Sequence, residues 1–219
     1  MHRRRFLTIT VSSMGGVLVY TLGRAPLRLV AEEKTVRIPL RFFTEEEALD
    51  LGAAAARIFP GDESGPGAKE AGVVIYIDRQ MAGPYGRDRD RYTQPPFEDG
   101  DPKFGYQGKA TPREIYREGL KTITGLNRLK PDEQDQKLRQ IEATMFFSLL
   151  RTHTIEGAFC DPMHGGNVDM IGWQMIGFPG PRMSYINEVD QYYGREFRPK
   201  PVSLQQMVGK PVRPSEEES

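Results

Sequence analysis

The sequence predicts a mainly α-helical protein: a single small helical domain of about five helices with long ordered loops, an N-terminal signal and a flexible C-terminal tail. Three observations predict this class. Capping boxes begin at Thr44 and Thr111. After each of them, apolar residues recur at helical spacing. The 17 prolines and 23 glycines indicate much loop around a modest core, since only 38% of the 219 residues are hydrophobic.

Residues 1–31 are typical of a twin-arginine export signal. They contain five arginines and no acidic residue. Arg3 and Arg4 stand one residue before Phe6 and Leu7, and the apolar stretch that follows is too short and too polar for a stable membrane span. A basic start to an ordinary helix is the alternative interpretation. The pattern fits either cleavage after Ala31 or retention of the segment as an anchor.

Such a signal predicts passage through the twin-arginine translocase in a folded state, a route for proteins that acquire a cofactor or a partner before export. The chain has no G-x-G-x-x-G after a strand and no C-x-x-C-H, so we expect no cofactor in this chain and a partner protein instead. Residues 32–219 carry 25 basic and 30 acidic side chains, which disfavours a nucleic-acid partner.

Residues 32–197 are predicted to form the helical domain. Residues 36–43 read as a short extended lead-in, and the first helix follows Thr44 and ends at Pro60. Residues 68–81 have helical spacing, although their β-branched run leaves a strand as the alternative. Residues 83–110 form a long loop whose tyrosines and phenylalanines are expected to lie against the domain or a partner, while its alternating arginines and aspartates look like a solvated face.

Three further helices are predicted in the second half. The first runs from Thr111 to about Leu126, the second opens at Lys130 and continues through Ile141, and the third covers residues 143–159. Residues 185–193 are predicted to form a short helix. Residues 198–219 are proline-rich and then acidic, which predicts an arm or a disordered tail.

The chemically versatile side chains gather in residues 151–181. This segment holds two of the three histidines, the only cysteine and the only tryptophan. His153 and Glu156 are expected to share a helix face. A proline after Asp161 ends that helix. A compact loop should follow, containing Gly165, Gly166 and Asn167 and folded back onto the domain by the rings of Trp173 and Phe178.

Two interpretations of this segment remain open. His153, Glu156, Asp161 and His164 are competent metal ligands, so an autonomous periplasmic metalloenzyme is one hypothesis. In the other, His153 and Glu156 bond to loop amides and Asp161 caps a turn, so that the segment orders a partner surface with Trp173 and Phe178 as anchors.

Two further hypotheses have less support. Cys160 as a nucleophile competes with a packed thiol, and a carbohydrate-binding module using Trp173 rests on a single tryptophan.

The chain resembles the gluconate 2-dehydrogenase subunit 3 family over most of residues 1–181, and residues 198–219 lie outside the resemblance. The likeness rests on the twin-arginine start, on Ile58-Phe59-Pro60 with Asp62-Glu63-Ser64-Gly65-Pro66-Gly67-Ala68, on His153-Thr154-x-Glu156-Gly157-x-Phe159-x-Asp161-Pro162-x-x-Gly165-Gly166-Asn167, and on Gly172-Trp173 with Gly177-Phe178-Pro179-Gly180.

The resemblance implies the small subunit of a membrane-associated, periplasmic, flavin-dependent dehydrogenase that acts on sugars, sugar acids or polyols. In such complexes an FAD-binding large subunit carries out the oxidation and a c-type cytochrome subunit with haem c takes the electrons. The small subunit supplies the export signal and stabilises the large subunit. The resemblance therefore implies an accessory subunit that is not catalytic alone.

Overall fold

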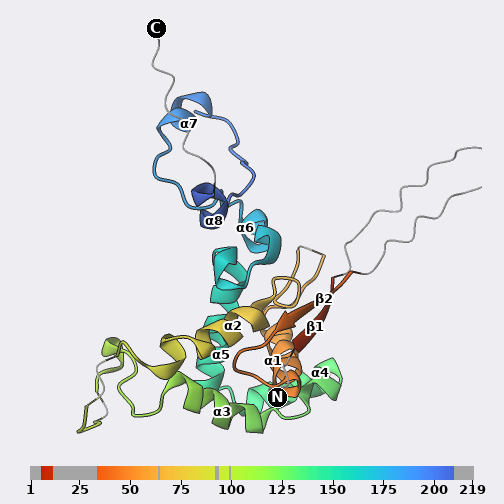
Figure 1. The fold of residues 1–219 in the computed structure, drawn as a ribbon, viewed down its shortest axis with the longest axis vertical. Helices are drawn as coiled ribbons and strands as arrows, with labels where there is room; N and C mark the ends of the chain where they lie inside the picture. Colours follow the sequence, from red (N-terminus) through yellow and green to blue (C-terminus); the bar gives the residue numbers. More distant parts are fainter. Residues whose placement is uncertain (1–5, 12–33, 64, 92–93, 99, 210–219) are drawn as a thin grey trace, which may run out of the picture.

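A computed structural model describes residues 6–11, 34–63, 65–91, 94–98 and 100–209 of the chain. The described part is mainly helical, as predicted (Figure 1). Five helices have ten residues or more: α1 Glu45–Ile58, α2 Val73–Ala82, α3 Pro112–Thr122, α4 Pro131–Gln140 and α5 Met145–Phe159. Three shorter helices follow: α6 Ile171–Ile176, α7 Ile186–Gln191 and α8 Leu204–Val208.

Two strands precede the helices. Strand β1, Phe6–Val11, pairs antiparallel with β2, Lys34–Pro39, and β2 overlaps the first half of the extended lead-in predicted at residues 36–43. Arg3, Arg4 and most of the predicted signal lie outside the described residues, as do the last ten residues of the predicted tail. None of the helices in the described part combines the length and apolarity that a membrane crossing requires.

The predicted capping boxes are present. Glu47 N donates to Thr44 Oγ1 at 3.2 Å and Thr44 N donates to Glu47 Oε2 at 2.7 Å, which satisfies two amides at the start of α1. Thr111 and Glu114 make the same exchange at the start of α3. Helix α3 ends earlier than predicted because the chain turns at Gly125, which has a φ of +76°.

The helical interpretation of residues 68–81 is confirmed, and the strand alternative is wrong. Helix α2 starts five residues later than predicted, at Val73. The preceding residue, Gly72, has a φ of +68°, a left-handed conformation that cannot continue back into a helix.

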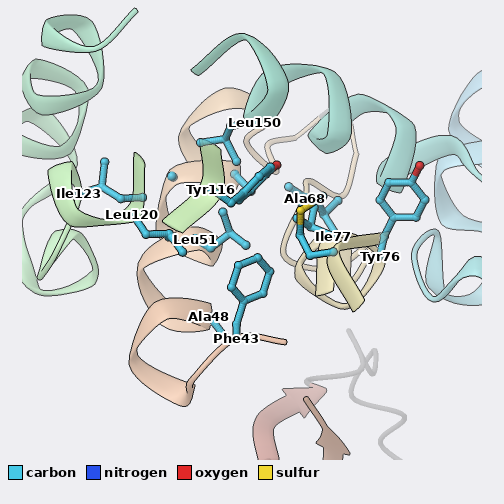
Figure 2. Close-up of a cluster of buried hydrophobic side chains, with 14 of the residues drawn as sticks. Phe43, Ala48, Leu51, Ala68, Tyr76, Ile77, Tyr116, Leu120, Ile123 and Leu150 are labelled. Atoms are coloured by element: carbon cyan, nitrogen blue, oxygen red, sulfur yellow. The ribbon is translucent and has the colours of Figure 1, made fainter. Parts of the chain in front are cut away.

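Helix α5 lies at the centre of the helical body and contacts α1, α2 and α3. The fully buried side chains Phe43, Leu51, Ile77, Tyr116 and Leu150 meet between these helices (Figure 2). Close packing of α3 on α5 requires a glycine, since a Cβ at position 119 would lie 2.0 Å from the ring of Phe146. The core therefore fixes α5, the helix that carries His153 and Glu156.

Two buried aspartates, which the sequence analysis did not single out, tie loops to this core. The carboxylate of Asp78 on α2 accepts hydrogen bonds from three consecutive backbone amides, those of residues 41, 42 and 43, at 2.8–3.1 Å. Asp50 on α1 accepts from the amides of Gly125 and Asn127 at 2.8 and 2.9 Å. Both carboxylates thus satisfy backbone donors that burial would otherwise leave unpaired.

The long loop at residues 83–110 is present, and part of it packs as expected. Tyr85 bonds to the helical body, as described below, whereas the side chain of Phe104 is 79% exposed. The expectation of a solvated charged face does not hold for Arg91. Its guanidinium pairs with Asp88 and donates to the carbonyls of Tyr106 and Gly108, so it holds the two ends of the loop together.

Two elements of the second half differ from the expected loop and tail. Residues 171–176 form helix α6 where a loop was predicted, and residues 204–208 form helix α8 within the predicted arm or tail. Helices α6, α7 and α8 extend from the C-terminal end of α5 away from helices α1 to α4 (Figure 1). Helix α7 lies inside the predicted range of residues 185–193.

Candidate functional site

His153 is enclosed by two tyrosines. Its side chain is 2% exposed, with Nδ1 2.8 Å from the hydroxyl of Tyr116 and Nε2 2.9 Å from that of Tyr85. Burial lowers the pKa of His153 to about 4, so the ring is neutral at pH 7. A neutral imidazole donates from one nitrogen and accepts at the other, and the two hydroxyls complement both. Neither ring nitrogen is left free to bind a metal.

Glu156 lies one turn further along α5 and is exposed. Its Oε2 accepts a hydrogen bond of 2.9 Å from the hydroxyl of Tyr76 on α2. Burial, and then the nearby Glu156 carboxylate, raises the pKa of Tyr76 well above its usual value, so the hydroxyl remains a donor. The expected loop amides are therefore not the partners of His153 and Glu156, because side chains of α2, α3 and the long loop reach them first.

The motif after Glu156 closes the C-terminal end of α5. The last carbonyls of a helix lack partners within the helix. Asn167 supplies two partners: its backbone N donates to Gly157 O at 2.8 Å, and its Nδ2 donates to Cys160 O at 2.8 Å. Its Oδ1 accepts from Gly172 N at 2.8 Å, which ties the loop to α6. Asn167 is fully buried and holds a left-handed conformation, with a φ of +46°.

Glycines allow the loop to approach the helix end. A Cβ at Gly166 would lie 2.2 Å from Gly157 O, and one at Gly172 would lie 2.0 Å from Ala158 O. Gly165 has a φ of +96°, which a side chain would strain. The structure therefore places Gly165, Gly166 and Asn167 as residues that order the loop on α5.

Trp173 completes the closure of the helix. Its ring is 4% exposed, its Nε1 donates to Phe159 O at 2.6 Å, and it contacts Phe178 edge to face with ring centroids 5.1 Å apart. This placement differs from the expectation of a partner-facing anchor, since the indole is already buried within its own chain. It also leaves no open face on which a sugar could stack. Phe178 is 38% exposed and covers the outer side of the indole.

Asp161 caps a turn, as one of the two interpretations expected. Its Oδ1 accepts from Met163 N at 3.0 Å, while Oδ2 accepts from Leu204 N, at the start of α8, at 2.7 Å. Cys160 is half-buried, and burial raises the pKa of its thiol to about 11, so it is protonated at neutral pH. A protonated thiol is a poor nucleophile.

His164 lies apart from His153. It is exposed and lines a groove of about 350 Å³ together with Arg41 and Arg79. These basic neighbours disfavour a cation at His164. Across the described residues, no three histidine, cysteine, aspartate or glutamate side chains gather as metal ligands would. His153, Glu156, Asp161 and His164 thus do not form a common site.

The tyrosines that form hydrogen bonds with His153 and Glu156 were not predicted from the sequence. Tyr76, Tyr85 and Tyr116 stand 80, 68 and 37 positions from their partners on α5, so no local spacing relates them. The surplus of aromatic residues in the long loop was the one available signal, because it indicated a loop with side chains to bury.

Comparison with known proteins supports one family. The model of the family described as gluconate 2-dehydrogenase subunit 3 matches residues 45–180, which include α1 to α6 and the whole His153–Trp173 motif. Searches of curated proteins and of solved structures found no match. The family match spans more than half of the chain and confirms the resemblance seen in the sequence. The chain belongs to the gluconate 2-dehydrogenase subunit 3 family.

Proposed function

We propose that this chain is the non-catalytic small subunit of a periplasmic flavin-dependent dehydrogenase that oxidises gluconate, related sugars or polyols. By its description the family is one subunit of a complex with several. In the proposed complex the large subunit holds FAD and a c-type cytochrome subunit with haem c receives the electrons. The complex lies on the periplasmic side of the inner membrane, where the twin-arginine translocase delivers the pair of subunits already folded.

The observation that carries this proposal concerns residues 151–180, the family segment, in which different side chains are turned inward and outward. Its versatile side chains are engaged internally: His153 by two tyrosines, Asn167 by backbone groups and Trp173 by Phe159 O. Its exposed side chains include large apolar ones: Met163, Val168, Met175, Ile176 and Phe178 are between 38% and 59% exposed. An exposed apolar surface on an ordered loop is typical of a subunit interface.

The stabilising role follows from the same surface. Covering exposed apolar side chains removes them from water, at about 25 cal/mol per Å² of apolar area. A partner that binds only the folded form of the large subunit shifts the folding equilibrium of that subunit towards the native state. The small subunit would therefore raise the stability of the flavoprotein without contributing to its chemistry.

Export tests the proposal. Replacing Arg3 and Arg4 with lysine should leave both this chain and its flavoprotein in the cytoplasm, as measured by fractionation and flavin content. Arg5→Lys is the matched control, because it keeps the arginine pair while making the same chemical change next to it. Export of the flavoprotein alongside a retained double variant would contradict the proposal that this chain carries the signal for both.

A further inference from the structure

Residues 181–203 form a closed loop that projects from the helical body (Figure 1). Val202 N donates to Pro179 O at 3.1 Å, and Leu204 N donates to Asp161 Oδ2 at 2.7 Å. The two ends of the loop come into close contact at Gly180, where a Cβ would lie 2.1 Å from Val202 O. Both ends of the loop are thus fixed next to the family motif at the end of α5.

The interior of this loop is ordered by Arg182. Its guanidinium pairs with Glu188 on α7 and lies over the rings of Tyr185 and Phe197, 5.7 and 5.6 Å from their centroids. Phe197 in turn packs on Tyr192, with 4.8 Å between centroids. These contacts join the beginning, the helix and the end of the loop, so its shape is set before any partner binds.

The loop exposes large apolar side chains, and its exposed charged side chains are Asp190, Arg195, Glu196, Arg198 and Lys200. Met183 is 101% exposed, Tyr193 87%, Ile186 76% and Val189 60%. Ile186 and Val189 are three residues apart on α7 and share one face. Of the nineteen exposed large hydrophobic side chains in the described residues, twelve lie between Met163 and Val208. Monomeric proteins rarely keep such a concentration uncovered.

We propose that residues 181–203 form a pre-organised docking loop whose Met183, Ile186, Val189 and Tyr193 bind an apolar depression on the flavin-bearing subunit. The inference rests on the proposed function and specifies the element that makes the contact. It extends the exposed apolar surface of the family segment, since Ile176 ends α6 and Phe178 directly precedes Pro179, whose carbonyl closes the base of the loop. A loop that is already ordered loses less conformational entropy on binding, which favours a tight contact from few residues.

The charges of α7 favour a protein over a lipid surface as the occupant. Helices that lie in a membrane interface usually carry lysine or arginine on their polar face. Helix α7 has six residues, and its only charged side chains are Glu188 and Asp190. The ion pair with Arg182 already occupies Glu188. The exposed basic side chains of the loop, Arg195, Arg198 and Lys200, lie outside α7, and Arg198 pairs with Glu196. The helix that presents Ile186 and Val189 therefore has an acidic polar face, which anionic lipid would repel.

Asp161 positions the far end of the loop relative to α5. One carboxylate oxygen caps the turn after α5 and the other holds the start of α8, so the residue connects the family motif to the far end of the loop. The loop itself lies beyond the matched residues 45–180. Its contribution is therefore a feature of this chain rather than of the matched segment.

The test uses the full chain co-produced with its flavoprotein. The double variant I186D/V189D should weaken the complex at least about 10-fold, measured by titration of the tagged chain against the purified flavoprotein, because it places two charges in an apolar contact. Its melting temperature should match that of the wild type, because both side chains are exposed. Gln191→Asp is the matched control, since it adds the same charge to an exposed position on the same helix and should leave the affinity within about 2-fold.

Three outcomes would overturn the inference. The first is unchanged affinity of I186D/V189D in a complex that the wild type does form. The second is a wild-type dimer in gel filtration that the variant dissolves without affecting the flavoprotein complex, which would make a second copy the occupant. The third is variant-sensitive binding to phosphatidylglycerol vesicles alone, which would make lipid the occupant.

Failure of the wild type to bind any flavoprotein would contradict the proposed function instead. If I186D/V189D melts early, the fully exposed Met183→Asp provides the same readout.

Discussion

At the residue scale, His153 joins three parts of the fold through its two ring nitrogens. Two tyrosine hydroxyls occupy its ring nitrogens, and the stacked ring of Tyr116 lies 5.7 Å from it, nearly parallel. Its burial removes it from solvent and from any proton donor other than these hydroxyls. The neutral imidazole is therefore a bridge between α3, α5 and the long loop.

The low pKa of His153 predicts a pH dependence of stability. The pKa of His153 is about 4 in the folded chain, and its ordinary value is 6.5. Between these two values, His153 binds a proton in the unfolded chain but not in the folded chain. Stability should thus be highest above pH 6.5 and fall as the pH drops towards 4, by up to roughly 3 kcal/mol from this group. Urea unfolding of the wild type and of His153→Gln at pH 7 and pH 4.5 measures the difference.

The comparison isolates His153 because glutamine offers a donor and an acceptor but does not titrate in this range. His164→Gln is the control for the substitution itself: that side chain is exposed, and its replacement should leave the stability at pH 7 unchanged. An equal loss of stability on acidification in wild type and His153→Gln would show that His153 is not a buried neutral group.

The sequence could indicate which residues belong to the candidate site but not which residues they form hydrogen bonds with. The sequence places His153, Glu156 and Asn167 in one polar segment, and Asp161 caps a turn as expected. Their partners could not be predicted, because Tyr76, Tyr85 and Tyr116 come from other elements and only the tertiary packing brings them to α5. Trp173 was expected to face a partner, yet its Nε1 finds the unpaired carbonyl of Phe159.

At the element scale, the motif is a C-terminal cap for α5. A Cβ at Gly172 would lie 2.0 Å from Ala158 O, whereas a Cβ at Gly177, which caps the same helix α6, would have no atom within 4 Å. Gly172→Ala should therefore separate α6 from α5 and cost roughly 2–4 kcal/mol of unfolding free energy. Gly177→Ala should cost only about 1 kcal/mol, from its positive φ of 67°.

Thermal or urea unfolding of the two alanine variants gives the comparison. The account requires Gly172→Ala to be clearly less stable than Gly177→Ala. The reverse order would mean that the approach of α6 to α5 does not hold the segment together.

The presence of the long helices was easier to predict than the residues at which they begin and end. The capping boxes at Thr44 and Thr111 predicted two helix starts correctly, since a cap depends only on residues three positions apart. Helix α6 was missed because its six residues include a glycine and follow three residues with left-handed conformations, at positions 167, 169 and 170. Helix α8 was missed because a proline-rich and acidic composition describes an unsupported tail, whereas Asp161 supports this one.

At the scale of the whole molecule, a helical body holds the core and the end of α5 presents an apolar surface. The family, the helical class and the number of long helices could be predicted from the sequence. The projecting loop at residues 181–203 could not, because its closure depends on contacts between Asp161, Pro179 and residues more than twenty positions later. Its exposed apolar side chains are the basis for the proposed docking contact.

The partner should also protect this surface. Ile176 is 59% exposed on the family segment, and its replacement by aspartate should leave the isolated fold intact while weakening association with the flavoprotein at least about 10-fold. Gln174→Asp on the same helix is the matched control, because that side chain is exposed. Equal affinities for the two variants would place the interface elsewhere on the chain.

The central claim is that this chain is a subunit of a flavin-dependent dehydrogenase, and co-purification tests it most directly. A tagged copy expressed in its own host should be recovered from the periplasmic extract together with a larger protein, in fixed stoichiometry and with the absorbance of bound flavin. Dehydrogenase activity towards gluconate, a sugar or a polyol should follow the same fractions. Recovery of the chain alone, with flavoprotein and activity in separate fractions, would contradict the account.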